Sequence, residues 1–316
     1  MLSFFKLIRI QNLLIVAATQ YLMRFAVIAP ILEINDFSLQ MAEIEFFILV
    51  FSTVCLTAAG YVINDYFDTK TDNLNHPETV IVGKSIKRRS AMTIHLIFNF
   101  IGVIGGFYVS YKIGLYQLGI IFLIVSGMLW YYSTTYKRQF LIGNILVAFL
   151  TGLVPLMVIL FEMPELNNAY REILIDNNTN FNHIFFWVAG FSFFAFITTL
   201  TREIIKDTED FEGDSAYGRN TVPIMLGISW TKVIIVGLIA ITLLGIILIY
   251  FKFLTGSLLT LLYVGIAIVI PMLFLTFKIV KANKKAHYHF ASVFMKFIML
   301  TGILYSLVAA YIFSNL

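Results

Sequence analysis

The sequence predicts an all-α protein that crosses a membrane nine times. Three observations predict this fold class: an apolar composition, apolar stretches near 20 residues that recur along the whole chain, and basic residues that gather in alternate loops. Of the 316 residues, 59% are hydrophobic and 13% are charged, whereas a soluble domain carries about 25% charged residues. The hydrocarbon core of a bilayer needs roughly 20 apolar residues in a helix. A soluble helical protein would need a polar face on each helix, and most of these stretches have none.

The expected helices follow the apolar stretches in order. They cover residues 10–30, 45–63, 92–110, 114–133, 141–161, 183–201, 231–251, 256–277 and 293–313. The first helix is expected to be a retained anchor rather than a cleaved signal peptide. Gln20 and Arg24 interrupt its apolar stretch, and no small-residue cleavage site follows.

The loop charges predict the orientation of the chain. Lysine and arginine gather in the loops of one side, whereas acidic residues such as Glu162 and Glu165 accumulate on the other. The positive-inside rule then places the N-terminus and the basic loops in the cytoplasm and the C-terminus outside. We therefore expect a multi-pass integral membrane protein, in the inner or plasma membrane if the cell is prokaryotic, with its active site at the cytoplasmic side.

Two acidic segments follow apolar helices on this cytoplasmic side. The first is "NDYFDTKTD", which begins at Asn64. If the preceding helix continues, Asn64, Asp68 and Asp72 stand at i, i+4 and i+8 on one face, and Asp65 lies off that face. Like charges stacked in this way repel one another, so a cation is expected among them.

The second segment is "REIIKDTEDFEGD", in which Asp207, Asp210 and Asp214 stand at i, i+3 and i+7, again on one helical face. Four intervening helices return the chain to the same side of the membrane, so the two segments are expected to face one another. Oxygen ligands without cysteine or histidine at ligand spacing favour Mg²⁺ or Ca²⁺ over zinc. Mg²⁺ completes its coordination shell with water and substrate phosphates. The pair of segments therefore predicts a magnesium-bridged diphosphate site.

The expected metal ligands are Asn64, Asp68, Asp72, Asp207, Asp210 and Asp214. Basic residues suited to diphosphate oxygens are Lys84, Lys87, Arg88, Lys137, Arg202 and Lys206. Two alternatives stay open. The acids could be ordinary solvated loop residues, and the bases could serve only membrane orientation and contact with anionic lipid.

These segments resemble the two signature segments of the UbiA superfamily of intramembrane prenyltransferases. "NDYFDTKTDNLNHP" is similar to NDxxDxxxD, and "TREIIKDTEDFEGDSAYGRNTVPIMLG" contains DxxxD. "YYSTTYKRQFLIGN" lies where the family has a loop with tyrosine and lysine. The resemblance covers nearly the whole chain. It implies a nine-helix bundle around a central lipid-accessible cavity, formed by a single domain over residues 1–316 with acidic loops at about 64–90 and 202–222.

The resemblance also implies an activity. The second segment looks most like the branch that makes archaeal-type ether lipids, the digeranylgeranylglyceryl phosphate synthases. We therefore expect an Mg²⁺-dependent prenyltransferase that moves a polyprenyl group from its diphosphate to geranylgeranylglyceryl phosphate. The resemblance to this branch implies that the polyprenyl group is geranylgeranyl. The expected partners are this donor, a lipid or aromatic acceptor and membrane lipid, with no nucleic acid.

Four residues are expected to act in catalysis. Asp68 and Asp210 would hold Mg²⁺ against the departing diphosphate, which is Lewis-acid assistance to a leaving group. Tyr131 and Tyr132 would stabilise the allylic cation by about 1–2 kcal/mol each through their ring faces. For the tyrosines, an interfacial aromatic belt is the alternative.

One departure from the branch concerns the first loop. Thr79 and Val80 stand where that branch has an Arg-Pro pair, so Lys84, Lys87 or Arg88 would have to supply the arginine's contact. Other acceptors used in the superfamily are an aromatic quinone precursor and haem. The alternative from another class is a transporter of ions or anionic lipids. Transporters, however, usually place polar residues near the middle of the membrane, whereas here the acids gather at one mouth.

Overall fold

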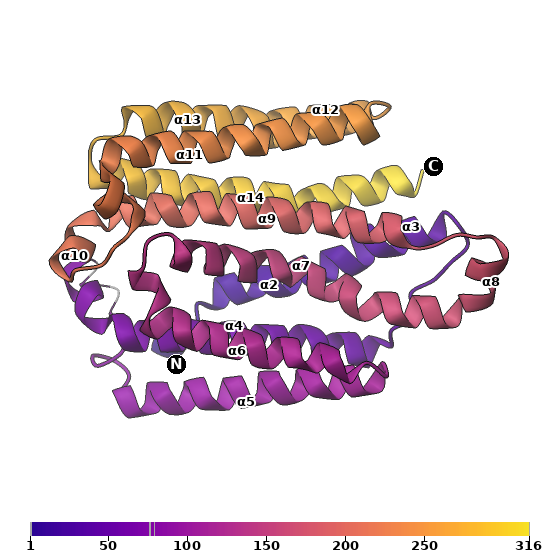
Figure 1. Cartoon of the computed structure of the whole chain (residues 1–316), viewed down its shortest axis with the longest axis horizontal. Coiled ribbons are helices and arrows are strands. Elements are labelled where there is room, and N and C mark those ends of the chain that lie inside the picture. The colour runs from indigo at the N-terminus through magenta and orange to yellow at the C-terminus, as the bar shows by residue number, and fades with distance from the viewer. Residues whose placement is uncertain (1, 76, 79, 316) are drawn as a thin grey trace. The chain divides into compact units, whose positions relative to one another are not determined.

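The protein is described by a computed structural model that covers residues 2–75, 77, 78 and 80–315 (Figure 1). Thr79 of the departing first loop lies outside the described residues. Over the described ranges every regular element is a helix, and the β pairing is limited to an isolated bridge between Val82 and Ile86. The predicted all-α class is confirmed.

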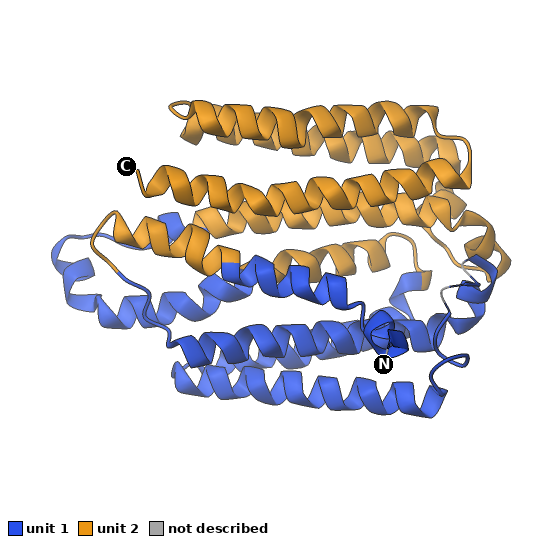
Figure 2. Ribbon diagram, turned by 180° about the vertical axis from the view of Figure 1, so that it is seen from behind, with its two compact units in different colours: residues 1–21, 38–137, 156–185 blue, residues 22–37, 138–155, 186–316 orange. Residues whose placement is uncertain are grey.

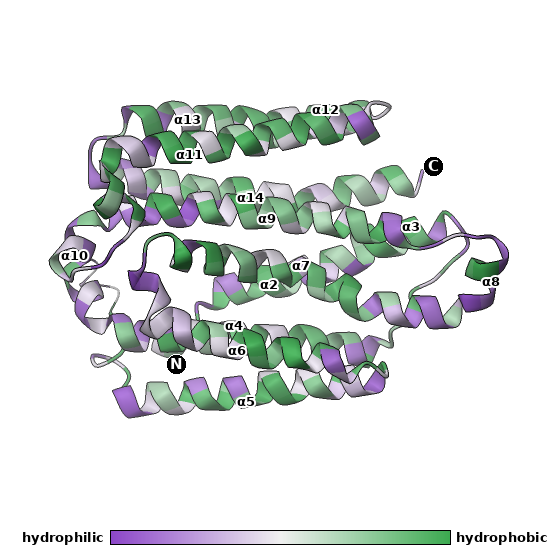
Figure 3. Ribbon diagram, in the orientation of Figure 1, coloured by the Kyte–Doolittle hydropathy of each residue, from purple (hydrophilic) through white to green (hydrophobic). Residues whose placement is uncertain are grey.

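Nine helical spans in the described part of the chain are long and apolar enough to cross a membrane, and Figure 3 shows their hydrophobic character. The first span joins α2 (Ile10–Leu22), the π-helical η1 (Met23–Ile28) and α3 (Ala29–Glu33). The next five are α4 (Glu43–Asn75), α5 (Arg88–Lys112), η2 (Tyr116–Leu118) with α6 (Gly119–Thr134), α7 (Ile142–Ala169) and α9 (Asn182–Glu209). The last three are α11 (Val222–Ile249) with η4 (Tyr250–Leu254), then α12 (Leu258–Val264), η5 (Gly265–Val269) and α13 (Ile270–Lys281) as one span, and α14 (Lys285–Phe313).

Short helices lie outside these spans: α1 (Leu2–Leu7), η3 (Tyr136–Arg138), α8 (Arg171–Asp176) and α10 (Phe211–Ala216). The chain divides into two compact units, drawn in separate colours in Figure 2. Unit 1 comprises residues 1–21, 38–137 and 156–185, and unit 2 comprises residues 22–37, 138–155 and 186–316.

Helix α4 is longer than a membrane requires, and this length positions the first acidic segment. Its 33 residues extend about 50 Å, against a hydrocarbon thickness of about 30 Å. Asn64 lies about 32 Å along the helix from Glu43, since each residue adds about 1.5 Å. The helix continues through Asn64, Asp68 and Asp72, so the condition for a shared face is met. The acids therefore lie where α4 leaves the apolar layer.

Close packing of α4 against α5 and α6 fixes the rotation of α4 within unit 1. A Cβ on Gly102 of α5 would lie 2.7 Å from the Leu56 Cγ of α4, and one on Gly106 would lie 2.2 Å from the Phe122 Cγ of α6. The GxxxG pair therefore serves close helix approach, as is common between membrane helices.

The start of α4 is held by a buried acid of the same unit. Glu162 on α7 is 0% exposed, and its Oε1 accepts hydrogen bonds from the backbone N–H of Gln40 at 2.6 Å and of Met41 at 3.0 Å. These residues immediately precede α4. The carboxylate thus satisfies backbone donors that would otherwise lack partners in a buried position.

Unit 2 has its own core, in which α9, α11, α13 and α14 meet. Fully buried side chains from each helix form it, among them Ile205, Ile239, Leu275 and Met295. This core fixes α9, which carries Asp207 near its end.

Gly227 interrupts α11 with φ 79° and ψ 159°, a conformation that glycine adopts without the steric cost of a Cβ.

Candidate functional site

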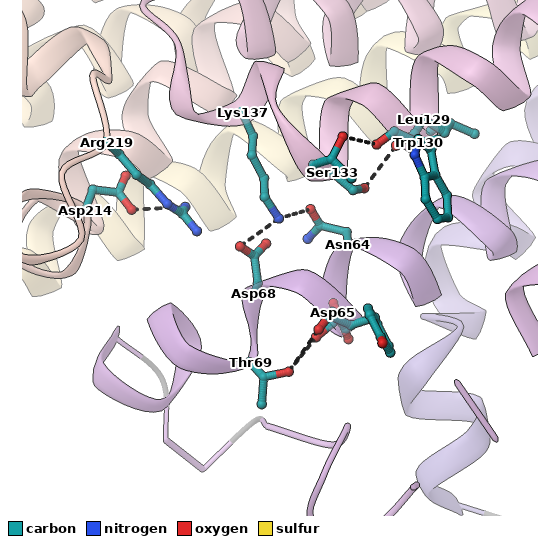
Figure 4. Close-up of polar contacts among 12 residues, drawn as sticks. Asn64, Asp65, Asp68, Thr69, Leu129, Trp130, Ser133, Lys137, Asp214 and Arg219 are labelled. Atoms are coloured by element: carbon teal, nitrogen blue, oxygen red, sulfur yellow. Dashed lines mark hydrogen bonds and ion pairs between the residues drawn. The ribbon is translucent and has the colours of Figure 1, made fainter. Parts of the chain in front are cut away.

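The first acidic segment surrounds a lysine. Lys137 of η3 places its Nζ 2.8 Å from the Oδ1 of Asp68 and donates a longer hydrogen bond, 3.4 Å, to the Oδ1 of Asn64 (Figure 4). The Lys137 and Asp68 side chains are only 4% and 9% exposed. Two of the three predicted ligands, Asn64 and Asp68, thus contact the Lys137 ammonium. Asp72 is half-buried two turns beyond Asn64 on the same helix.

Asp65, the acid that lies off this face, has a different partner. Arg9 donates from its Nη2 to the Oδ1 of Asp65 at 2.8 Å, and its guanidinium lies 4.8 Å from the ring centroid of Tyr61. Burial lowers the pKa of Arg9, but the interactions with Asp65 and Tyr61 outweigh this effect and raise the pKa above its usual value. Arg9 therefore stays charged. Sequence reasoning used Arg9 only for orientation and missed this contact, because its partner is 56 residues away.

The three predicted bases of the first loop lie around other groups. Lys84 donates to the backbone carbonyl of Pro77 at 2.7 Å. Arg88 lies 4.1 Å from the Tyr66 ring centroid and donates a long hydrogen bond, 3.4 Å, to Thr69. Lys87 is exposed at the start of α5. In unit 1, Lys137 is thus the predicted base that the described contacts place on the acidic face.

The second acidic segment is not one continuous helix. Helix α9 ends at Glu209, Asp210 has non-helical ψ (9°), and α10 begins at Phe211. The expectation that Asp207, Asp210 and Asp214 share one regular face is wrong for this reason. Backbone hydrogen bonds still link the turn, from the N–H of Asp210 to Lys206 O at 2.9 Å and from the N–H of Asp214 to Asp210 O at 3.0 Å. Asp207 therefore lies on α9 and Asp214 on α10, and Asp210 lies at the junction of the two helices.

Two of these acids have close polar partners. Asp207 accepts a hydrogen bond of 2.8 Å from the amide of Asn144 on α7. Asp214 is paired with Arg219 at 3.1 Å (Figure 4), and its side chain is 3% exposed. Sequence reasoning missed Asn144 and counted Arg219 only toward orientation. No local signal identifies Asn144, whereas Arg219 follows Asp214 closely enough to be considered.

The predicted bases of unit 2 meet an acid that the sequence reasoning passed over. Glu203 accepts from Arg202 at 2.8 Å and from Lys206 at 3.4 Å. Lys206 follows Glu203 by three residues, a spacing that places both on one side of α9. Within the second segment, Arg202 and Lys206 thus form ion pairs with Glu203, and the Lys206 side chain is still 37% exposed.

The two predicted catalytic tyrosines differ in their surroundings. Tyr131 is 57% exposed, and its ring is tilted against that of Tyr136 at 6.1 Å between centroids. Tyr132 is half-buried. Both lie near the end of α6, one or two turns before Lys137. Their role at a cation stays a prediction.

The donor chemistry of both segments fits a hard divalent cation. Each segment offers carboxylate or amide oxygens, and the buried Asp68 is already stabilised by a positive charge. Among the residues described, no group of three His, Cys, Asp or Glu side chains is placed to hold a metal by itself. Mg²⁺ commonly binds through one or two carboxylates and leaves its other positions to water and phosphate, so a sparse ligand set suits it.

Comparison with known proteins gives the family. Residues 36–308 match the family described as "UbiA prenyltransferase family". The chain is 34% identical over 202 residues to a digeranylgeranylglyceryl phosphate synthase of Methanothermobacter thermautotrophicus, covering 63% of each chain. It is 30% identical over 257 residues to that of Methanosphaera stadtmanae, covering 80% of this chain and 84% of the relative. The match to that of Pyrococcus horikoshii, 34% identical, covers 57% of this chain and 56% of the relative. The first and third alignments thus span less than two thirds of those relatives.

Solved structures show the same fold. A structure reported as "Structural and mechanistic insights into the biosynthesis of Digeranylgeranylglyceryl phosphate synthase in membranes" matches with a TM-score of 0.66 and 24% identity, covering 99% of this chain and 98% of that one. A UbiA homolog from Archaeoglobus fulgidus bound to GPP and Mg²⁺ matches with a TM-score of 0.58 and 14% identity, covering 97% and 99%. The resemblance that the two acidic segments indicate is confirmed: the chain belongs to the UbiA prenyltransferase family.

Proposed function

We propose that the protein is an Mg²⁺-dependent prenyltransferase that moves a geranylgeranyl group from its diphosphate to geranylgeranylglyceryl phosphate. The observation that carries the proposal is the buried cluster of Lys137 with Asn64 and Asp68, in a chain of this family. The names of the curated relatives support the acceptor, and the homolog with GPP and Mg²⁺ supports the donor class and the metal.

The acids of each unit have a defined part in this proposal. In unit 1, Asn64 and Asp68 would hold Mg²⁺, and in unit 2, Asp210 and Asp214 would do so; the metal would neutralise charge on a departing diphosphate. Asp72 and Asp207 stand close in sequence to these ligands, and Asp207 is already engaged by Asn144. Asp72 and Asp207 would add carboxylate oxygens to the metal-binding segments of their own units.

Lys137 supplies a positive charge in the same place. Its ammonium carries three donors, and the described contacts engage it with Asp68 and Asn64. With Mg²⁺ held by Asn64 and Asp68, Lys137 would donate to diphosphate oxygens. Arg219, paired with Asp214, offers the planar fork that suits phosphate oxygens. Each base would, within its own unit, stabilise negative charge on a phosphate group.

The position at the end of long apolar helices suits the substrates. A polyprenyl tail is as apolar as the lipid around α4, so the donor can approach with its tail in the membrane and its diphosphate at the acids. Exclusion of water protects an allylic cation from capture by hydroxide or water. Loop charges support a cytoplasmic position for the N-terminus and for both acidic segments.

The test is prenyl transfer by the purified protein in detergent, followed with labelled geranylgeranyl diphosphate in Mg²⁺ or in EDTA. Geranylgeranylglyceryl phosphate and a set of aromatic acids serve as acceptors. We expect Mg²⁺-dependent transfer to the glycerol phosphate. Transfer to an aromatic acid instead would keep the reaction and overturn the acceptor, whereas absence of transfer to every acceptor would overturn the function.

Variants test the assignment of residues. Asp68→Asn and Asp210→Asn should each lower turnover by at least a hundredfold while the protein still inserts and purifies. Glu78→Gln is the matched control, because Glu78 is an exposed acid that follows the same helix and lies outside the acidic face. Full turnover in both aspartate variants would refute the metal assignment.

A further inference from the structure

The backbone at Arg9 is unusual. Between α1 and α2 the chain turns sharply, and Arg9 has φ 53°, a left-handed conformation that residues with a Cβ rarely adopt. The turn is fixed on both sides. The N–H of Arg9 donates to Lys6 O at 3.1 Å, and the Arg9 carbonyl accepts from the N–H of Asn12 at 2.8 Å. Strain of this kind persists where the surrounding structure holds it, and it often accompanies a functional constraint.

Apolar packing of the N-terminal segment on α4 holds the turn in place. Leu7 is 0% exposed and Ile8 is 5% exposed, and both belong to a core that includes Ala58 and Val62 of α4. Glycine would adopt the left-handed turn at lower cost. The presence of arginine there therefore calls for a role of its side chain.

The side chain of Arg9 engages two successive turns of α4. Its guanidinium lies 4.8 Å from the Tyr61 ring centroid and donates to Asp65 at 2.8 Å. Asn12 in turn donates to the Tyr61 hydroxyl at 3.3 Å. The Asp65 side chain is 16% exposed, so its carboxylate is largely removed from water and depends on Arg9 for compensation.

Asp65 is the acid best placed to disturb the proposed metal face. It is adjacent to Asn64 and three residues before Asp68 on the same continuous helix. Without Arg9, its carboxylate would be free to attract Lys137 or to bind the divalent cation from the wrong side of α4. Either event would alter the contacts that Asn64 and Asp68 make with Lys137 or with the divalent cation.

We propose that Arg9 is a positioning residue that neutralises Asp65 and holds it off the metal-binding face of α4, so that Asn64 and Asp68 form that face with Lys137. The inference rests on the proposed function. It assigns the strained N-terminal turn to the shape of the first acidic segment, not to direct contact with substrate.

The experiment measures Mn²⁺ binding to the purified full chain in detergent by electron paramagnetic resonance, without prenyl donor, together with kcat and KM in Mg²⁺. In Arg9→Met the released Asp65 should tighten Mn²⁺ binding by at least threefold and lower kcat at least tenfold, with KM for the donor changed less. Arg9→Lys should recover part of both effects. Lys6→Met is the matched control, since Lys6 is an exposed base of the same segment, and it should behave as the wild type.

The decisive variant is the compensated pair R9M/D65N. It lacks the uncompensated carboxylate, so Mn²⁺ binding and kcat should return to within about twofold of the wild type. A pair as defective as R9M would overturn the inference, because substrate contact or docking of the N-terminal helix would then explain the loss. If D68N binds Mn²⁺ as the wild type does, the proposed function itself fails. If D68N loses binding while R9M binds and turns over normally, only the inference fails.

Discussion

Replacement of Lys137 by methionine tests the central contact of unit 1. The Nζ of Lys137 and the Oδ1 of Asp68 are 2.8 Å apart, and the two side chains are 4% and 9% exposed. At an effective dielectric constant of about 20, the gross attraction of unit charges at this distance is about 6 kcal/mol. Desolvation of both groups offsets much of it, but removal of one partner leaves the other charge buried. Such a change costs about 3–5 kcal/mol.

The expected consequence is a loss of thermal stability that a divalent cation reverses. A shift of about 2 °C per kcal/mol gives a Tm that is about 6–10 °C lower for K137M than for the wild type in EDTA. Mg²⁺ can supply the charge that Asp68 has lost, and a ligand at a hundred times its Kd stabilises by about 2.7 kcal/mol. The Tm of K137M should therefore rise with Mg²⁺ more than that of the wild type, while prenyl transfer stays impaired.

The assay is thermal unfolding in detergent, followed by tryptophan fluorescence in EDTA and across a series of MgCl₂ concentrations. Lys84→Met is the matched control, because Lys84 is exposed and its Nζ contacts the Pro77 carbonyl. Its Tm should stay within about 1 °C of the wild type, since exposed substitutions change stability by only about 0.5 kcal/mol. If K137M unfolds at the wild-type temperature in EDTA, or if Mg²⁺ shifts both proteins equally, the reasoning is refuted.

Three further predictions concern packing, a buried hydrogen bond and orientation. Gly106→Ala should lower the free energy of unfolding by about 1–3 kcal/mol in a thermal melt, because its Cβ would lie 2.2 Å from a ring atom of Phe122. Gly127→Ala is the control: a Cβ there meets nothing within 4 Å, so its Tm should be unchanged or higher. Asn144→Leu leaves Asp207 without its amide donor and should cost about 1–3 kcal/mol in the same melt; an unchanged Tm would contradict the importance of that contact. Ser85→Cys should react with an impermeant maleimide in inverted vesicles and not in intact cells, since the native cysteine is buried; labelling of intact cells would reverse the proposed orientation.

The sequence alone predicts the first acidic segment well because its geometry is local. Once α4 continues past Ile63, the spacing of Asn64, Asp68 and Asp72 places them on one face, and the structure contains this continuous helix. The apolar stretches likewise predict the nine spans, since length and composition determine whether a helix can cross a membrane. Periodicity and hydropathy are properties of neighbouring residues, so they can be read without tertiary contacts.

Tertiary contacts determine the features of the candidate site that local sequence patterns do not predict. Nothing in "DTEDFEGD" marks a helix end at Glu209, because the segment has no proline and its glycine comes four residues later, yet the helix is interrupted at Asp210. Lys137 was expected to bind phosphate, but its place between Asn64 and Asp68 depends on how η3 packs near α4. The partnership of Arg9 with Asp65 joins residues 56 positions apart, which no periodicity in a single sequence reveals.

The buried Glu162 has a consequence for the opposite end of α4. It fixes the backbone just before Glu43, whereas the acids that face Lys137 begin about 32 Å farther along the same helix. An uninterrupted helix transmits axial shift and rotation along its length, and one residue of rotation turns a side chain by about 100°. A slip at the Glu162 anchor would therefore carry Asn64 and Asp68 away from Lys137 without any change at the acids. The hydrogen bonds of Glu162 at one end of α4 therefore help to set the position and rotation of the acids near its other end.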